Sequence, residues 1–424
     1  MKKSLLNLKA LHAGIVLTAA FQIFVSADSF GQITPRALGM GGAYSALSRG
    51  VHAVSWNPAN LGLPDNPKFT FTMASIGVAA GNNSFSWNTV NDYEGRYWDE
   101  GDKRDILDMI PDRGFAVHSQ VSVRAFSFSA GRFALTVDAL ADARGQLDKT
   151  LFELLLSGNE IGKAYDFSDM NVRGMGIGSV GLSYAHPVSA GFADHFSLGG
   201  TFHFYYGGAN LRMDRMISTV SLETYGFDVD GEYEGRAATG GMGWGMDFGA
   251  SAQWGDKWTG GAVLRNLAST IPWNKEVKKF TGYFTGEALS IEEIVKGDDG
   301  EAYQDSSWEE DSGSFTQGLP VVLDIGVCFR EGKYLICADY IQGFQNGFFS
   351  RTVPQVSIGT EWKGVGWLPL RMGILFGGEM GYATSFGFGL HPGRFALDFG
   401  WMNRGFFLPG SSKGVVFGLE IGFY

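Results

Sequence analysis

The chain has 424 residues, a formal net charge of −11, 62 glycines, 14% aromatic residues and 18% charged residues. A soluble enzyme of this length usually carries more charge and fewer aromatics, and an acidic chain has no electrostatic basis for binding nucleic acid. After the N-terminal region no uninterrupted apolar run of about 20 residues occurs, which argues against a bundle of membrane helices.

The first 27 residues have the three-part pattern of a secretory signal peptide. Three lysines lie within the first nine residues, residues 11–25 are apolar, and small residues precede Asp28. This pattern predicts export and cleavage after Ala27. The alternative is an N-terminal membrane anchor, which the shortness of the apolar stretch and the strand-rich remainder disfavour.

From residue 69 onward the sequence alternates between apolar and polar residues with a period of two, as β-strands do. In residues 321–329, for example, large apolar residues occupy the odd positions, whereas Asp324 and Cys328 lie among the even ones. The runs are about ten residues long, longer than most strands of soluble sandwiches and sufficient to cross a bilayer at a tilt. Fourteen such runs are predicted, over residues 69–80, 115–130, 132–142, 177–187, 195–207, 243–254, 257–267, 319–330, 333–343, 354–363, 367–377, 382–391, 394–403 and 414–424. Fourteen is an even number, as single-chain bacterial barrels require. Together with the alternation and the length of the runs, this count predicts that residues 69–424 form an all-β, antiparallel transmembrane barrel in the bacterial outer membrane.

The connections between these runs support the same topology. Those after the first, third, fifth and seventh runs are long, over residues 81–114, 143–176, 208–242 and 268–318. Those after the second and sixth runs are short, and the one after the fourth, at 188–194, is of moderate length. Outer-membrane barrels have short periplasmic turns and longer external loops. The long connections are therefore predicted to lie outside the cell.

Three of the long connections contain short helical patterns, at residues 105–110, 151–156 and 289–295. One interpretation is that these helices merely cap the loops. The other is that Leu154, Leu155 and Leu156 line an external binding groove. The acidic stretches 298–301 and 309–311 have ligand types suited to calcium, but a solvated loop is the simpler interpretation, and neither a metal site nor a cofactor is predicted.

The last run ends at Phe423 and resembles the C-terminal signal that the outer-membrane assembly machinery recognises, although Tyr424 follows the phased aromatic residue. Cys328 and Cys337 lie on the same side of one predicted hairpin. In an oxidising compartment they can form a cross-strand disulfide. Two reduced, packed thiols remain the alternative.

Charged residues recur on the strand faces that are predicted to line the lumen. They are Asp138, Asp247, Arg265, Asp324, Asp339, Glu361, Arg371, Asp398 and Glu420. They can either bond the wall to material inside the barrel or line a polar translocation path. We favour the first interpretation, because charge buried in a filled lumen must be paired.

Two motifs precede the first strand. The first is Arg36-Ala-Leu-Gly-Met-Gly-Gly-Ala-Tyr44 and the second contains Trp56-Asn57-Pro58-Ala59. Together they resemble the N-terminal signature of the FadL-type superfamily, the long-chain fatty-acid and hydrocarbon transporters and their PorV-type relatives. The resemblance implies that residues 28–68 form a hatch inside the barrel, which also fits the need to fill a fourteen-stranded lumen. The hatch residues that the motifs single out are Gly39, Gly41, Gly42, Trp56, Asn57, Pro58 and Ala59.

The resemblance implies a transporter of hydrophobic small molecules, such as long-chain fatty acids, with outer-membrane lipid around it and a hydrophobic ligand inside. The alternative is a PorV-type barrel that transports nothing and binds subunits of a secretion system. An outer-membrane enzyme is a third class, but serine, histidine and aspartate are too scattered in this sequence to nominate a catalytic triad. No enzymatic activity is predicted.

Overall fold

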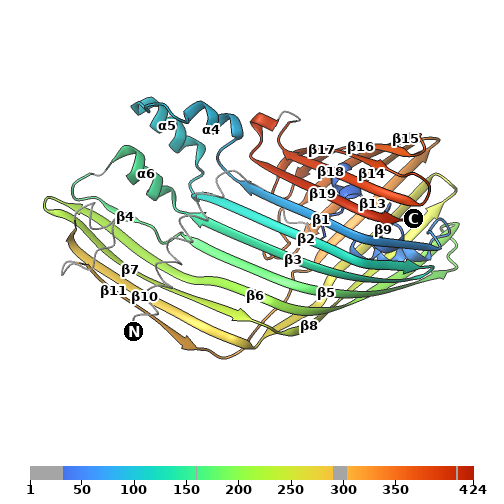
Figure 1. The fold of residues 1–424 in the computed structure, drawn as a ribbon, viewed down its shortest axis with the longest axis horizontal. Helices are drawn as coiled ribbons and strands as arrows, with labels where there is room; N and C mark the ends of the chain where they lie inside the picture. Colours follow the sequence, from blue (N-terminus) through green and yellow to red (C-terminus); the bar gives the residue numbers. More distant parts are fainter. Residues whose placement is uncertain (1–31, 159, 290–302, 407–408) are drawn as a thin grey trace.

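The computed structural model describes residues 32–158, 160–289, 303–406 and 409–424 (Figure 1). The predicted signal peptide lies outside the described residues. So does the predicted helix at 289–295, except for Leu289, which ends a strand.

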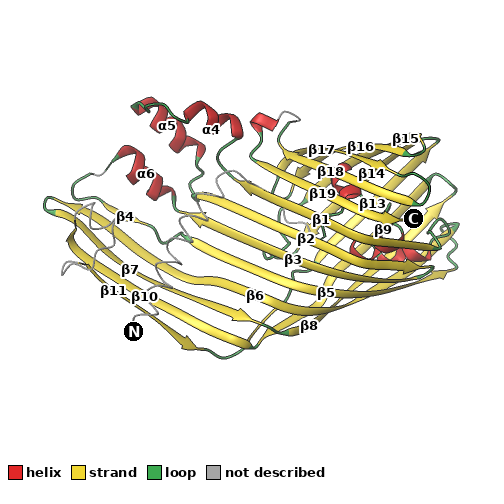
Figure 2. Ribbon diagram, in the orientation of Figure 1, coloured by secondary structure: helices red, strands yellow, loops and turns green. Residues whose placement is uncertain are grey.

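Fourteen antiparallel strands close into one barrel, as the sequence predicted (Figures 1 and 2). The ring closes because the first strand pairs with both the second and the last. In order around the wall they are β1 (Phe69–Asn82), β2 (Phe115–Ala130), β3 (Phe133–Leu147), β5 (Asn171–Val188), β6 (His195–Glu223), β8 (Met242–Trp254), β9 (Trp258–Trp273), β13 (Val322–Glu331), β14 (Tyr334–Gly343), β15 (Gln355–Val365), β16 (Leu368–Gly377), β17 (Gly381–Leu390), β18 (Phe395–Arg404) and β19 (Gly414–Phe423).

The wall has an apolar outside and a polar inside. On β19, Phe417 and Leu419 point outward and are 47% and 42% exposed, whereas Val416 and Glu420 point inward and are buried. This is the reverse of a soluble barrel and matches a barrel whose outer face contacts hydrocarbon. Exposed aromatic residues flank the tight turns, as in interfacial belts, and include Phe133, Trp254, Trp258, Tyr334, Trp367 and Phe395. Among the described residues, no helix combines the length and the apolar character needed to span a membrane.

The long connections at 208–242 and 268–318 were predicted as loops, and this prediction is wrong for most of their described residues. Strand β6 continues to Glu223, and the added strands extend the sheet far beyond one end of the barrel (Figure 1). These strands are β4 (Ala164–Asp166), β7 (Gly226–Thr239), β10 (Lys275–Leu289), β11 (Tyr303–Asp311) and β12 (Phe315–Gln317). Beyond the hydrocarbon both faces of a sheet meet water, so no apolar face marks these strands in the sequence.

Three helices lie at the same end of the barrel as the long connections, and two of them confirm the helical patterns at 105–110 and 151–156 (Figure 2). They are α4 (Trp87–Tyr93), α5 (Glu100–Met109) and α6 (Lys149–Ser157). Asp99 begins α5 with a capping box to Asp102, and Asp148 caps α6. A short turn of helix, η4 (Pro409–Ser411), precedes β19.

The segment before β1 folds into short helices inside the barrel, at the end with the tight turns (Figure 1). Its elements are α2 (Pro35–Gly39), η2 (Gly50–His52), α3 (Ala53–Trp56) and η3 (Pro58–Gly62). We call residues 32–66 the plug. Of the two alternatives for the cysteines, the structure has the disulfide. Cys328 and Cys337 face each other across β13 and β14 and are bonded.

Candidate functional site

The plug meets the wall along a seam of glycines. A Cβ on Gly39 would lie 2.9 Å from Cα of Gly387, and a Cβ on Gly373 would lie 2.3 Å from the amide nitrogen of Gly41. Gly41 also has a φ of 68°, which disfavours other residues. Side chains on this seam would push the plug off the wall.

Asn57 and Pro58 fix the second half of the plug. The Asn57 amide donates to the carbonyl oxygen of Ala250 (3.1 Å) and to the Ser251 hydroxyl (3.0 Å). Its oxygen accepts from the Ala59 amide (3.1 Å) and so caps η3, in which Pro58 is the first residue. One buried side chain therefore both starts a helix and bonds it to the wall.

A chain of buried ion pairs binds α2 to strands β15, β16 and β18. Arg36 donates two hydrogen bonds to Glu361, at 2.8 and 2.7 Å, and Arg371 donates to the same carboxylate at 2.7 Å. Arg371 also pairs with Asp398, which His391 contacts at 3.0 Å. Burial alone would lower the pKa of Arg36, but Glu361 outweighs burial and raises that pKa above its usual range. We call Arg36, Glu361, Arg371 and Asp398 the plug lock.

Two further carboxylates help to hold the plug, Asp339 directly and Asp138 through Arg124. Asp339 accepts hydrogen bonds from the backbone amides of Tyr44 (2.8 Å) and Ser45 (2.7 Å). Burial raises the pKa of Tyr44 to about 12, so its hydroxyl stays neutral. Asp138 pairs with Arg124 (2.7 Å), which also donates to the Ser55 hydroxyl of the plug at 2.5 Å.

All the charged residues that the sequence placed in the lumen are inside the barrel. Asp339, Glu361 and Arg265 bond the plug directly, and Glu420 contacts His52 of the plug at 3.0 Å. The others bond to wall residues: Asp138, Asp247, Asp324, Arg371 and Asp398.

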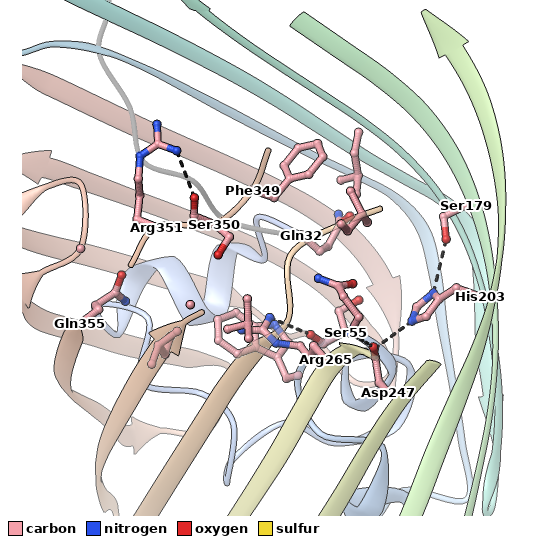
Figure 3. A pocket seen from close by; sticks show the side chains of 18 of the residues that line it. Gln32, Ser55, Ser179, His203, Asp247, Arg265, Phe349, Ser350, Arg351 and Gln355 are labelled. Carbon is pink, nitrogen blue, oxygen red and sulfur yellow. Dashed lines mark hydrogen bonds and ion pairs between the residues drawn. The ribbon is translucent and has the colours of Figure 1, made fainter. Parts of the chain in front are cut away.

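Above the plug the lumen holds a cavity of about 130 Å³, which we call the lumen cavity (Figure 3). The plug supplies Gln32, Ser55 and Trp56, and the wall supplies residues of strands β3, β5, β6, β8, β9, β13, β14 and β15. Among the residues that line it are Asp138, Ser179, His203, Tyr205, Asp247, Arg265, Asn266, Phe349, Arg351 and Glu379.

The connection 344–353, between β14 and β15, folds into the lumen as the roof of this cavity. Phe348 and Phe349 are only 4% and 8% exposed, and Phe349 has a φ of 58°, which is unusual for a side chain of this size. Arg351 holds the connection in place by a 2.9 Å bond to Glu379. Sequence reasoning missed this element, since nothing in the alternation distinguishes it from an external loop.

Beside the cavity the ladder of the wall is interrupted at β9. This strand pairs with β13 as far as Arg265 and with β12 only from Ile271 onward. Between these points the Asn266 amide and the Ser269 hydroxyl bond to the backbone at 319–320, at 3.0 and 3.1 Å, and Asn266 has a φ of 60°. A few side-chain bonds thus replace the regular ladder where the wall borders the cavity.

The predicted groove residues Leu154, Leu155 and Leu156 lie on α6, away from the lumen cavity. Leu155 is 69% exposed and its two neighbours are half-buried. Their role in an external groove remains a prediction.

The plugged, fourteen-stranded architecture belongs to the FadL-type class of folds, as the motifs indicated. Structural matches include the toluene transporter TbuX of Ralstonia pickettii (TM-score 0.55, 14% identity, 92% of this chain and 98% of that one). The toluene transporter TodX of Pseudomonas putida matches with a TM-score of 0.53 at 12% identity, over 92% of this chain and 98% of that one. A FadL homologue of Pseudomonas aeruginosa matches with a TM-score of 0.51 at 13% identity, over 94% and 99%.

At the level of sequence, the family of unknown function DUF5723 matches residues 58–239 and 218–397, and the chain belongs to this family. No curated protein matches the chain.

Proposed function

We infer that this protein is an outer-membrane channel that takes up small hydrophobic molecules. The observation that carries the proposal is the lumen cavity, which lies above a closed plug and next to the interrupted ladder of β9. A ligand that enters between the external loops would reach this cavity. Rearrangement at β9 or at the plug would then release it. The structural matches to toluene transporters support the same function.

The size of the cavity favours single-ring compounds over long-chain fatty acids. An engineered protein cavity of about 150 Å³ takes up one benzene molecule. The lumen cavity, at about 130 Å³, is close to that size, and Trp56, Tyr205 and Phe349 offer it aromatic surface.

The direct test is uptake of radiolabelled toluene and oleate by cells that lack their own FadL-type channels and express this protein. We expect toluene uptake well above that of cells with an empty vector, and little change for oleate. Ser179→Phe places a ring in the cavity and should reduce toluene uptake severalfold. Ser307→Phe, on the exposed strand β11, is the matched control.

Toluene uptake equal to that of the empty vector would overturn the proposal. In that case, recovery of secretion-system subunits with the intact protein would favour the PorV-type alternative.

A further inference from the structure

The lumen cavity contains more charge than an apolar ligand needs. Three acids line it, and each has close partners. Asp138 pairs with Arg124 at 2.7 Å, and Glu379 pairs with Arg351 and Arg144 at 2.9 and 3.0 Å.

The third acid, Asp247, is bonded on both oxygens. His203 contacts one oxygen at 2.9 Å, and the backbone amide of Asn266 donates to the other at 2.7 Å. The acids of the cavity are therefore occupied by wall groups. None of them needs a ligand to satisfy it.

Arg265 differs from the other cations of the cavity. Its Nε is buried and has no hydrogen-bond partner among the described residues. One terminal nitrogen lies 3.4 Å from the carbonyl oxygen of Ser55 and the other 3.6 Å from a carboxylate oxygen of Asp324. Both distances are long for a charged donor, which prefers about 2.8 Å. Arg265 therefore has unused capacity to bind an acceptor.

Arg265 is also surrounded by surface suited to a ring. The ring centroid of Trp56 lies 5.9 Å from its guanidinium carbon, and Arg265 and Ser55 face the same hollow (Figure 3). Tyr205 lines the cavity in a stack with His203, at 5.6 Å between ring centroids. An under-bonded guanidinium beside aromatic surface provides both a carboxylate partner and a contact for an aromatic face.

We propose that the preferred ligands of the lumen cavity are single-ring aromatic carboxylates, whose carboxylate pairs with Arg265 while the ring packs among Trp56, Tyr205 and Phe349. This inference rests on the proposed function and narrows its substrate class. The cation that this pairing requires is already present in the wall, because Arg265 lines the cavity and lacks close acceptors.

The test measures binding to the full-length protein in detergent by calorimetry, with three ligands that share one ring. Benzoate is anionic, benzyl alcohol is neutral and benzylamine is cationic. A hydrogen bond to a charged group justifies an expected preference for benzoate over benzyl alcohol of at least about tenfold. Benzylamine should bind more weakly than either. This comparison uses the wild-type protein, so it does not depend on how a variant folds.

Arg265→Gln should collapse the ratio of benzoate to benzyl alcohol affinity toward one, and Arg265→Lys should retain part of it. Arg215→Gln is the matched control, since Arg215 pairs with Glu232 on the external sheet extension, away from the lumen. The inference is overturned if benzoate binds no more tightly than benzyl alcohol, or if Arg265→Gln leaves the ratio unchanged. If toluene still enters cells in that case, only the inference fails. If no single-ring compound binds or enters, the proposed function fails as well.

Discussion

The contact between plug and wall and the cavity above the plug differ in how closely their buried charges are paired. In the plug lock, Arg36 donates to Glu361 at 2.7 and 2.8 Å, and Arg371 donates to the same carboxylate at 2.7 Å. At the cavity, Arg265 has only polar contacts of 3.4 and 3.6 Å. The first arrangement pairs its charges at short distances and holds the plug in place. The second leaves binding capacity facing a cavity, so only the second is suited to a ligand.

The largest effect should come from breaking the plug lock. Glu361→Gln leaves two buried guanidiniums without their shared anion, and removal of one partner of a buried ion pair costs about 3–5 kcal/mol. Urea unfolding in lipid vesicles would measure this loss, and planar-bilayer recordings should show a leak as the plug loosens.

Glu331→Gln is the matched control for the plug lock, because its pair with Lys257 is exposed and such pairs contribute about 0–1 kcal/mol. Equal losses for the two variants, without a leak, would show that the lock does not hold the plug.

The disulfide gives the next largest effect. Cys328 and Cys337 are nine residues apart and pack against the plug. Chain-entropy arguments give such a small loop at most about 2.5 kcal/mol. Replacing both with serine should lower the free energy of unfolding by up to this amount in oxidising buffer. Wild-type protein treated with a reductant should lose a similar amount, and no loss in either would contradict the prediction.

Asn57→Ala tests the other half of the plug. It removes bonds to Ala250, Ser251 and Ala59 and leaves buried partners unsatisfied, at a cost of about 1–3 kcal/mol. The same unfolding measurement applies, with the exposed Asn274→Ala as control. Because the cavity floor depends on the plug, benzoate affinity should fall with it. Unchanged stability would mean that the motif does not anchor the plug.

The smallest effect concerns acid pH at Asp65. Burial raises the pKa of this carboxyl, but Arg49, bonded at 2.8 Å, together with Gln253 outweighs burial and lowers it below its ordinary value. Because the folded-state pKa is lowered, ionised Asp65 stabilises the protein at pH values above the ordinary pKa of about 4. This contribution is lost as the pH falls through the folded-state pKa.

Since Asp65 is partly exposed, the contribution should stay below about 1 kcal/mol. Thermal unfolding between pH 7 and pH 3 should show a smaller decrease for Asp65→Asn than for the wild type. Identical pH profiles would show that Asp65 does not contribute to the pH dependence of stability.

The sequence predicts the strands within the bilayer better than the strands outside it. Within the bilayer, hydrocarbon on one side and a polar lumen on the other impose a period of two, so the fourteen strands could be located. Outside it that contrast disappears, and the strands β7, β10 and β11 were missed. The glycines and Asn57 were found through their motifs. The pairing of Arg36 with Glu361 could not be predicted from the sequence, because the two residues are 325 positions apart and meet only when the barrel closes.

The lumen cavity was also beyond sequence reasoning. Arg265 was predicted to face the lumen, but the roof 344–353 looks like an ordinary connection, and no local pattern shows that it folds inward. The missing acceptor of Arg265 depends on distances to Ser55 and Asp324, which come from separate parts of the fold.

The central claim is that the space above the closed plug holds one aromatic ring. The most direct test is a crystal structure of the protein grown with bromobenzene, in which bromine is located by its anomalous scattering. We expect a bromine peak between Trp56 and Phe349, with the bond between Arg36 and Glu361 intact. Bromine found only outside the lumen, or absent at saturating bromobenzene, would contradict it.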